Sequence, residues 1–433
     1  MAQRAKRPSI AMRFGASAVP EGIIGSGGQG TVYRVSADGR PMALKWYRKS
    51  ALGDRAEDIY NIILDNVERQ SPAPSFLWPR DISEWKDGSF GYLMDLAPAE
   101  HFHSVASIVN GYHSFASWTT EIDALLAIVL SFELLHNRGL SYQDINSGNF
   151  LIDTETGDVL ICDCDNIVVD GHASGIKGTE GFMAPEVILR GTNPGIDSDR
   201  FSLGVFLFYL LLRNHPFEGI RYFQDDSLSG NIGRLVYVDD PCFIMTAKGS
   251  KAYDPVNQAG TKKVWDSLPD HVKDLFIAAL GPASIKRPSV RPIERDWMEA
   301  LADLRSTVMH CGDCDSDFFA GRSGAYECPW CGKDGQLPWK MKLADRELPA
   351  IPRAELLRCQ LEICNSSQAL DRMGHIVNAK DRPYLYALVN DSEYTWVRSH
   401  KGEVVEVPPG ARCVLADGAE IRIGDEMIQI QAG

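Results

Sequence analysis

A glycine-rich loop between two strands is the feature that most constrains this chain of 433 residues. The segment Gly25–Val32 reads GSGGQGTV and fits the pattern GxGxxGxV. The following stretch, Thr31–Val35, is alternating and β-branched, so the loop joins strand to strand, whereas a dinucleotide-binding loop leads from a strand into a helix. Glycines let a backbone approach phosphates closely, because a Cβ would clash there. The loop alone fits either a phosphate site or a flexible hairpin turn.

A lysine follows this loop at the end of an apolar strand. Lys45 closes the run Met42–Lys45, fifteen residues after Gly30. A lysine in this position is costly to bury unless an anion accompanies it. The phosphates of ATP and a carboxylate from a helix would supply that charge. The alternative is a solvent-facing lysine at a strand end, and the preceding loop favours the nucleotide site.

Three more polar residues have the spacing of a phosphoryl-transfer site. Asn149 lies five residues after Asp144. Asp163 lies fourteen residues after Asn149, at the end of the apolar run Val159–Ile161. Phosphoryl transfer needs a carboxylate to orient the attacking hydroxyl, hard oxygen ligands for Mg²⁺ or Mn²⁺, and a cation on the phosphates. Asp144, then Asn149 with Asp163, and finally Lys45 fit these roles. A lone Asp–Asn pair is more often a turn or cap, but all four residues occur in one order.

Further landmarks follow in order: Gly178-Thr179, Ala184–Glu186, Asp199–Gly204 and Lys286–Pro288. With these, residues 14 to about 300 resemble the eukaryotic-type Ser/Thr protein kinases, here of bacterial type. The resemblance implies an α+β fold with a small lobe at 14–97, a large lobe at 98–305, and ATP in the cleft between them. It implies that a protein hydroxyl is the acceptor.

The same resemblance implies roles for individual residues. Glu186 is expected to pair with Arg287, and Asp199 is expected to hold the catalytic loop by hydrogen bonds. An adenine-contacting hinge is expected near Met94–Ala97. ATP contacts are expected at Gly25, Gly27, Gly30, Val32, Ala43, Lys45, Asp95 and Ala97.

The chain departs from the family pattern around the catalytic loop. The usual His and Arg before Asp144 are Tyr142 and Gln143, which puts control by phosphorylation of the activation loop in doubt. The usual Lys two residues after Asp144 is Asn146, which removes a cation from the transferring phosphoryl group. Where the family has Asp-Phe-Gly, this chain has Asp163, Cys164 and Asp165.

The small-lobe helix gives no obvious carboxylate for Lys45. The segment 54–70 offers Glu57, Asp65 and Glu68, none of them at a convincing position. These departures keep a pseudokinase scaffold, which binds nucleotide without transfer, as an alternative. A small-molecule phosphotransferase is a second alternative, although the landmarks at 178–186 favour a protein substrate.

Four cysteines form two close pairs late in the chain. Cys311 and Cys314 make one CxxC pair, and Cys328 and Cys331 make the second after thirteen residues. Two such turns supply a tetrahedral set of thiolates, which predicts a structural Zn²⁺ site in a ribbon at 306–340. Four reduced structural cysteines or a redox pair are the alternatives, but a redox CxxC would not need a second copy. The stretch 336–352 contains three prolines and reads as a linker.

The last part of the chain, 341–433, reads as an all-β, sandwich-like domain. Apolar and polar residues alternate at period two, which predicts strands at 384–389, 394–397, 403–407, 412–415, 420–423 and 427–430. The segment Val414–Gly424 resembles the last strands of forkhead-associated (FHA) domains. The order kinase, ribbon, β-domain resembles kinases of tellurite-resistance-type systems. That resemblance implies a von Willebrand A-domain protein and a metal-dependent Ser/Thr phosphatase as partners.

Composition sets the remaining limits. Lys and Arg total 44 and Asp and Glu total 58, so the formal net charge is 44 − 58 = −14. This acidic balance argues against a nucleic-acid partner, since neutralising phosphates needs clustered Lys and Arg. Residues 1–13 read as a basic tail without the apolar core of a secretory signal. No apolar run reaches the length that crosses a bilayer. We therefore expect a cytoplasmic protein without a membrane partner.

Overall fold

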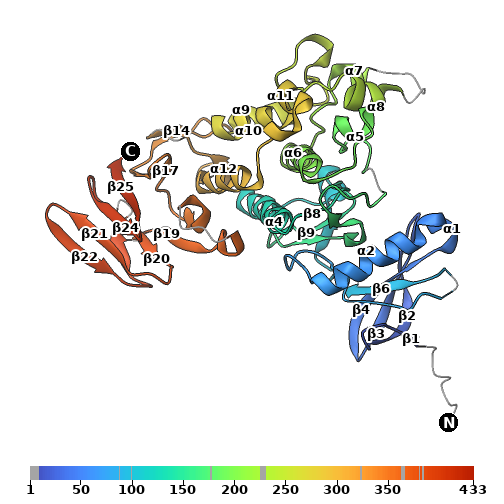
Figure 1. Ribbon diagram of the computed structural model, residues 1–433. Coiled ribbons are helices and arrows are strands. Elements are labelled where there is room, and N and C mark those ends of the chain that lie inside the picture. The colour runs from blue at the N-terminus through green and yellow to red at the C-terminus, as the bar shows by residue number, and fades with distance from the viewer. Residues whose placement is uncertain are drawn as a thin grey trace.

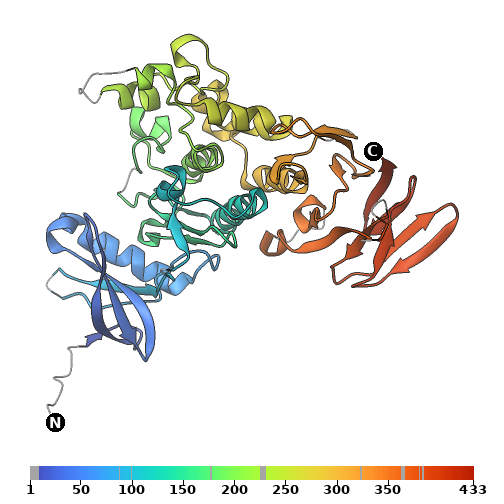
Figure 2. The same cartoon turned by 180° about the vertical axis from the view of Figure 1, so that it is seen from behind.

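The computed structural model describes residues 9–433 apart from 87, 99, 176–177, 225–230, 322–323, 362–365, 380 and 383–384. A β-rich small lobe leads into a helical large lobe, and a cysteine cluster and β-sheets follow it. The small lobe and the C-terminal sheets lie on opposite sides of the helical lobe (Figures 1 and 2). The predicted fold class is therefore confirmed.

The small lobe is built on an antiparallel sheet with the strand order β1-β2-β3-β4-β6-β5. Its strands are β1 (Ile10–Ala11), β2 (Ser17–Ser26), β3 (Gly30–Ala37), β4 (Arg40–Tyr47), β5 (Asp81–Ile82) and β6 (Gly91–Asp95). The sheet begins inside the range 1–13, for which we expected a tail, because Met12 is buried beneath it. Lys45 on β4 pairs with Val32 on β3, so the strand register places this lysine beside the glycine loop.

Two helices accompany this sheet, α1 (Lys49–Leu52) and α2 (Ala56–Arg69). Helix α2 buries Tyr60, Ile63 and Asn66, which recur every three residues and therefore share one face. All the carboxylates of α2 stand at exposed positions instead: Glu57, Asp58, Asp65 and Glu68.

The large lobe is mostly helical and packs around one apolar core. Its helices are α3 (Val105–Val109), α4 (Trp118–His136), α5 (Pro185–Leu189), α6 (Ile196–Leu212), α7 (Ile220–Phe223), α8 (Asn231–Arg234), α9 (Ala259–Ser267), α10 (Asp270–Leu280), α11 (Pro282–Lys286) and α12 (Glu294–Ser306). Helix α6 is apolar on every side and buried, as a central core helix is. Among the described residues, no helix is both long and apolar enough to cross a membrane.

Short strands carry the catalytic residues at the face of this lobe. These are β7 (Phe102–Ser104), β8 (Leu140–Ser141), β9 (Phe150–Asp153), β10 (Val159–Ile161) and β11 (Val168–Val169). Strand β8 pairs with β11, and β9 pairs with β10. The segment 142–149, hereafter the catalytic loop, joins β8 to β9, and Asp163 follows β10.

Two small hairpins carry the cysteines, and two packed sheets follow them. The hairpins are β12 (Val308–Cys311) with β13 (Ser316–Phe319), and β14 (Ala325–Glu327) with β15 (Asp334–Gln336). One sheet has the order β17-β16-β25-β24-β21-β22 and the other the order β18-β19-β20-β23. Their strands are β16 (Trp339–Lys342), β17 (Glu347–Pro349), β18 (Glu355–Leu357), β19 (Arg372–Asn378), β20 (Tyr386–Asn390), β21 (Trp396–His400), β22 (Glu403–Val407), β23 (Arg412–Val414), β24 (Glu420–Ile423) and β25 (Glu426–Ala432).

Apolar side chains from both sheets form one core, which makes this region a sandwich. Leu388 and Trp396 from opposite sheets are fully buried in it. The expected linker at 336–352 was wrong, because β16 and β17 lie within it. Strand β16 pairs with β25 near the end of the chain, and this distant partner has no local signature in the sequence.

The sandwich is fixed to helices α4 and α12 of the large lobe. Arg305 on α12 pairs with Asp123 on α4 at 2.5 Å and with Glu355 on β18 at 2.7 Å. Gln360 donates to Asp303 on α12 at 3.0 Å. Three apolar residues of the C-terminal region, Leu357, Cys359 and Ala369, pack into the large-lobe core. The contact therefore combines buried charge with shared apolar packing.

Candidate active site

Lys45 lies at the centre of the cleft between the lobes and contacts two carboxylates. Its Nζ is 3.2 Å from Asp163 Oδ1 and 2.8 Å from Asp165 Oδ2. Burial alone would lower the pKa of Lys45, but the charges of Asp165 and Asp163 outweigh this effect and raise it. The lysine is therefore a permanent cation. The side chain of Asp163 is 44% exposed toward the cleft, while that of Asp165 is 2% exposed.

The catalytic loop brings Asp144 and Asn149 together. Asn149 Nδ2 donates to the backbone carbonyl of Asp144 at 3.0 Å and lies 3.4 Å from its Oδ2. These contacts turn the amide nitrogen toward Asp144 and leave the amide oxygen as a hard ligand for a cation. The hydroxyl of Thr179 donates to Asp144 Oδ1 at 2.8 Å. Asp144 therefore already accepts an alcohol proton, which is the interaction that an acceptor hydroxyl needs.

Asn146, which stands where the family has a lysine, stabilises the loop instead. Its Nδ2 donates to the Asp144 carbonyl at 3.0 Å, and its Oδ1 accepts from the Gly148 N–H at 2.8 Å. The side chain is thus used within the loop rather than at a phosphate.

Asp199 at the start of α6 anchors the catalytic loop, as expected. It accepts from the backbone N–H groups of Tyr142 at 2.6 Å and Gln143 at 2.9 Å. His136 lies between Asp199 (3.3 Å) and Glu294 (2.9 Å). Burial would lower the pKa of His136, but hydrogen bonds to both carboxylates raise it to about 9. Helix α12, which carries Glu294, is thus linked to the catalytic loop through a buried charged chain.

Gln143 holds the segment that follows Asp163, hereafter the activation segment (163–186). Its Nε2 donates to the carbonyls of His172 at 2.7 Å and Pro194 at 2.9 Å, and its Oε1 accepts from the Ser174 N–H at 3.1 Å. Its backbone adopts φ +68, a left-handed conformation that the surrounding contacts hold in place. An uncharged amide therefore makes the contacts that order the described part of this segment.

The glycine loop closes over Lys45. Gln29 in the loop lies 3.5 Å from Lys45 Nζ through its Oε1. Arg48 donates to the Gly27 carbonyl and to Ser26 Oγ. An added Cβ at Gly30 would overlap the backbone of Trp46, so the close approach of β3 to β4 requires glycine there.

The predicted ATP contacts lie around one apolar recess. Gly25 and Gly27 lie at the end of β2 and in the loop after it. Asp95 is exposed and pairs with Arg80 at 2.6 Å, which leaves its backbone groups for a nucleotide. The recess is formed by the buried Ala43 and Met94 with the partly buried Val32, Leu96, Ala97, Leu160 and Cys162. An apolar slot beside a fixed cation suits a flat base joined to phosphates.

The expected pairing of Glu186 with Arg287 was wrong. Arg287 is exposed at the end of α11. Arg291 makes the pair instead, with Nη1 at 2.7 Å from Oε1 and Nη2 at 2.9 Å from Oε2 of Glu186. A turn at Pro288–Val290 carries the chain inward, so the buried arginine is the one four residues later.

Comparison with known proteins agrees with this geometry. The model of the protein kinase domain matches residues 19–298. The chain belongs to the protein kinase family. The Ser/Thr-protein kinase mos of Patiria pectinifera is 29% identical to the kinase over 216 residues, 46% of this chain and 58% of that protein. Beta-adrenergic receptor kinase 1 of Mesocricetus auratus is 31% identical over 207 residues, which cover 45% of this chain and 29% of that protein. G protein-coupled receptor kinase 2 of Caenorhabditis elegans is 31% identical over 206 residues, 45% of this chain and 28% of that protein.

Sequence reasoning missed the role of one residue in the kinase, Asp165. We treated it as a departure from the family glycine, and the structure places it against Lys45 and the hydroxyl of Tyr47. The available signal was the coincidence of two unusual features, an acidic residue at the glycine position and a small-lobe helix without a suitable carboxylate.

The four predicted cysteines of the kinase come together. Their Sγ atoms all lie within 4.8 Å of one another, and Cys311–Cys331 and Cys314–Cys328 are both 3.7 Å apart. Four thiolates about 2.3 Å from a tetrahedral zinc would be about 3.8 Å apart, so the donor set fits Zn²⁺. Backbone N–H groups of Cys314 and Asp313 lower the pKa of Cys311 to about 7, which favours the thiolate that binds metal.

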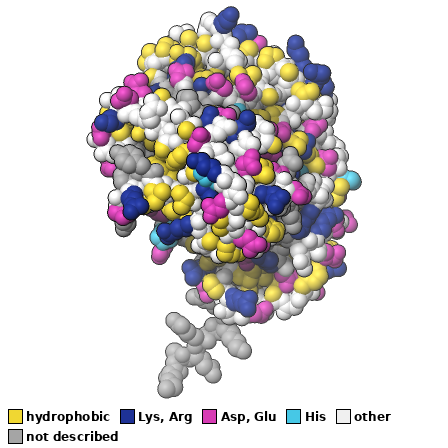
Figure 3. Space-filling view, turned by 90° about the vertical axis from the view of Figure 1, so that its left-hand side faces the viewer, with side chains coloured by type: hydrophobic (Ala, Val, Ile, Leu, Met, Phe, Trp, Pro, Cys, Tyr) yellow, Lys and Arg dark blue, Asp and Glu magenta, His cyan; other side chains and the backbone are white. Residues whose placement is uncertain are grey.

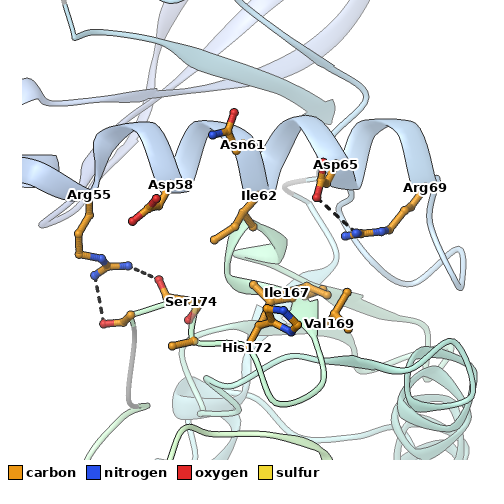
Figure 4. Close-up of a pocket in the computed structure, with 13 residues that line it drawn as sticks. Arg55, Asp58, Asn61, Ile62, Asp65, Arg69, Ile167, Val169, His172 and Ser174 are labelled. Carbon is orange, nitrogen blue, oxygen red and sulfur yellow. Dashed lines mark hydrogen bonds and ion pairs between the residues drawn. The ribbon is translucent and has the colours of Figure 1, made fainter.

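A separate cavity of the kinase lies between α2 and the activation segment (Figure 4). Its volume is about 570 Å³, and its lining includes Ile62, Asp65, Ile167 and His172. Arg55, just before α2, donates to the backbone carbonyls of Ser174 and Gly175 across this space. The helix is therefore tied to the activation segment.

Proposed function

We propose that the chain is an ATP- and Mg²⁺-dependent Ser/Thr protein kinase that transfers the γ-phosphoryl group to a protein hydroxyl. The observation that carries the proposal is the convergence of Lys45, Asp163, Asn149 and Asp144 on one cleft, with the Thr179 hydroxyl already on Asp144.

The residues would divide the work as follows. Lys45 holds the phosphates as a buried cation, and the apolar recess around Ala43 receives the base. Asp144 accepts the hydrogen bond of the acceptor hydroxyl and orients its oxygen toward the γ-phosphorus. Asn149 and Asp163 would hold Mg²⁺ or Mn²⁺, which neutralises charge on the phosphates when bound.

The test is transfer from γ-labelled ATP by the full chain, with itself and a generic protein as acceptors. Asp144→Asn keeps the shape of the side chain and removes its basicity, so we expect a loss of about 100-fold to 10,000-fold in rate. Asp158→Asn is the matched control, because Asp158 is exposed in the turn between β9 and β10. Labelling that survives Asp144→Asn would overturn the proposal. Nucleotide binding without transfer, under titration of both metals and of partners, would favour the pseudokinase scaffold.

We also propose that the C-terminal region recruits the substrate or a partner. Charges of both signs and apolar side chains mix on the face of the sandwich seen in Figure 3. The edge strand β22 exposes 67% of Val404 and 42% of Val405. The resemblance to FHA domains and to tellurite-resistance-type kinases favours a von Willebrand A-domain protein and a metal-dependent Ser/Thr phosphatase as partners. Transfer onto, or co-elution with, proteins of those classes is the test, and Val404→Lys should weaken both.

A further inference from the structure

We propose that Asp165 is the positioning residue for Lys45, in place of a carboxylate from the small-lobe helix. The inference rests on the proposed function, because it concerns how the lysine of that site is oriented. It adds a role for an acidic residue at the position where the family pattern has glycine.

The contacts of Asp165 support this role. Its Oδ2 is 2.8 Å from Lys45 Nζ and also accepts from the hydroxyl of Tyr47, which precedes it by 118 residues on β4. Both partners are buried, with Lys45 at 5% and Asp165 at 4% exposed. A buried cation needs a buried partner that stays in place, and Asp165 meets that need.

Asp163 is less suited to the same task. It lies farther from Lys45, at 3.2 Å, and 44% of its side chain is exposed toward the cleft. A carboxylate in that position can turn toward a metal without uncovering a buried charge. The two acidic residues therefore have separate tasks, with Asp165 fixing the lysine and Asp163 facing the nucleotide.

Helix α2 offers no competing carboxylate. Glu57, Asp58, Asp65 and Glu68 are exposed, and the buried face of α2 carries Tyr60, Ile63 and Asn66. Figure 4 shows Asp65 engaged with Arg69 along the helix rather than with the cleft.

The helix reaches the site through backbone contacts instead. Asn66 Nδ2 donates to the carbonyl of Ile167 at 2.9 Å, just after the turn Cys164–Asn166 that carries Asp165. The orientation of Lys45 therefore follows this turn and does not depend on an ion pair made by α2.

The experiment is a double-mutant cycle on the full chain. Asp165→Asn is measured with Lys45 present and in a Lys45→Met background, by affinity for a fluorescent trinitrophenyl-ATP with Mg²⁺ and by kcat and KM. With Lys45 present, we expect a loss of about 100-fold in kcat, because a misplaced group costs about that much, and a smaller loss of affinity. In the Lys45→Met background, Asp165→Asn should leave the affinity unchanged, since residues that act through each other are not additive.

Two further variants guard against a folding defect. Tyr47→Phe keeps the ring packed on Phe90 and removes only the hydrogen bond to Asp165, so it should lower kcat several-fold and be non-additive with Asp165→Asn. Asp65→Asn and Glu57→Gln on α2 are the matched controls and should match the wild type.

The outcomes separate the two proposals. An equal loss of affinity in both Lys45 backgrounds, or none in either, would overturn the role of Asp165. Loss of kcat in Asp65→Asn or Glu57→Gln would also overturn it, because the helix would then supply the partner. A wild-type chain that binds nucleotide but transfers no phosphoryl group would overturn the kinase proposal alone, and the binding cycle would still decide Asp165. A wild-type chain that binds no nucleotide would overturn both.

Discussion

Arg291 lies fully buried between Glu186 and the helical lobe, with 0% of its side chain exposed. Besides the two hydrogen bonds to Glu186, it donates to the carbonyls of Asp197 at 2.6 Å and Ser284 at 3.2 Å. Its guanidinium also stacks 5.0 Å from the ring of Phe201. One side chain thus joins the end of the activation segment to α6 and to α11.

Removing this arginine should destabilise the large lobe strongly. Arg291→Ala leaves Glu186 without its partner in a nearly buried site, so we expect a loss of about 3–5 kcal/mol in the free energy of unfolding. Arg287→Ala is the control, and as an exposed substitution it should change stability by no more than about 0.5 kcal/mol. Denaturation in urea measures both. Equal effects of the two variants would contradict the pairing described here.

Residues of the site differ in how far the sequence predicts them. The order and spacing of Lys45, Asp144, Asn149 and Asp163 suffice to bring them into one hypothesis, because each has a distinct chemical task. The partner of Lys45 was not predictable in the same way. Asp165 lies 120 residues away, and its contact with the lysine depends on how the two lobes pack.

The paired hairpins β12–β13 and β14–β15 form an element with little apolar core of its own. Three buried residues, Cys311, Phe318 and Cys328, make up its cluster. It packs on the large lobe through Phe319 against Trp118 and through Trp330 beneath the ammonium of Lys263. An element of this kind depends on metal for its folding free energy.

We therefore expect one zinc per chain by elemental analysis. Cys328→Ala should abolish metal binding and lower the melting temperature, because three thiolates do not complete a structural site. Cys242→Ala, which is outside the cluster and partly exposed, should keep the metal. Unchanged zinc content in Cys328→Ala would contradict the site.

The strands of the sandwich illustrate what period-two alternation can predict. Strands β22 and β24 lie at the predicted bounds, 403–407 and 420–423, because each alternates between a buried face and solvent. The strand predicted at 384–389 begins outside the described residues and is observed as Tyr386–Asn390. Strands β16 to β19 were not predicted, since prolines and short lengths hide their alternation.

At the scale of the whole molecule, the sandwich and the catalytic domain form one packed unit. Arg305 is 11% exposed and bridges α4, α12 and β18 through two carboxylates. Glu133 on α4 accepts from Ser366 at 3.2 Å, which adds a further contact across the same boundary.

Breaking this bridge should loosen the sandwich from the lobe. Arg305→Ala leaves Asp123 and Glu355 unpaired, so we expect a loss of about 3 kcal/mol or more in the free energy of unfolding and faster proteolysis near β18. Arg372→Ala removes a 48%-exposed partner of the same Glu355 and should cost no more than about 1 kcal/mol. If both variants resist protease as the wild type does, the interface is not held by Arg305.

The fixed position of the sandwich limits which targets the kinase can modify. A protein gripped there would be held behind the helical lobe, on the side away from Lys45 and Asp144 (Figure 1). Its folded body could not enter the cleft from that position. The hydroxyl that receives phosphate would therefore have to sit on a long, unstructured tail of the target, able to wrap around the lobe while its body stays moored.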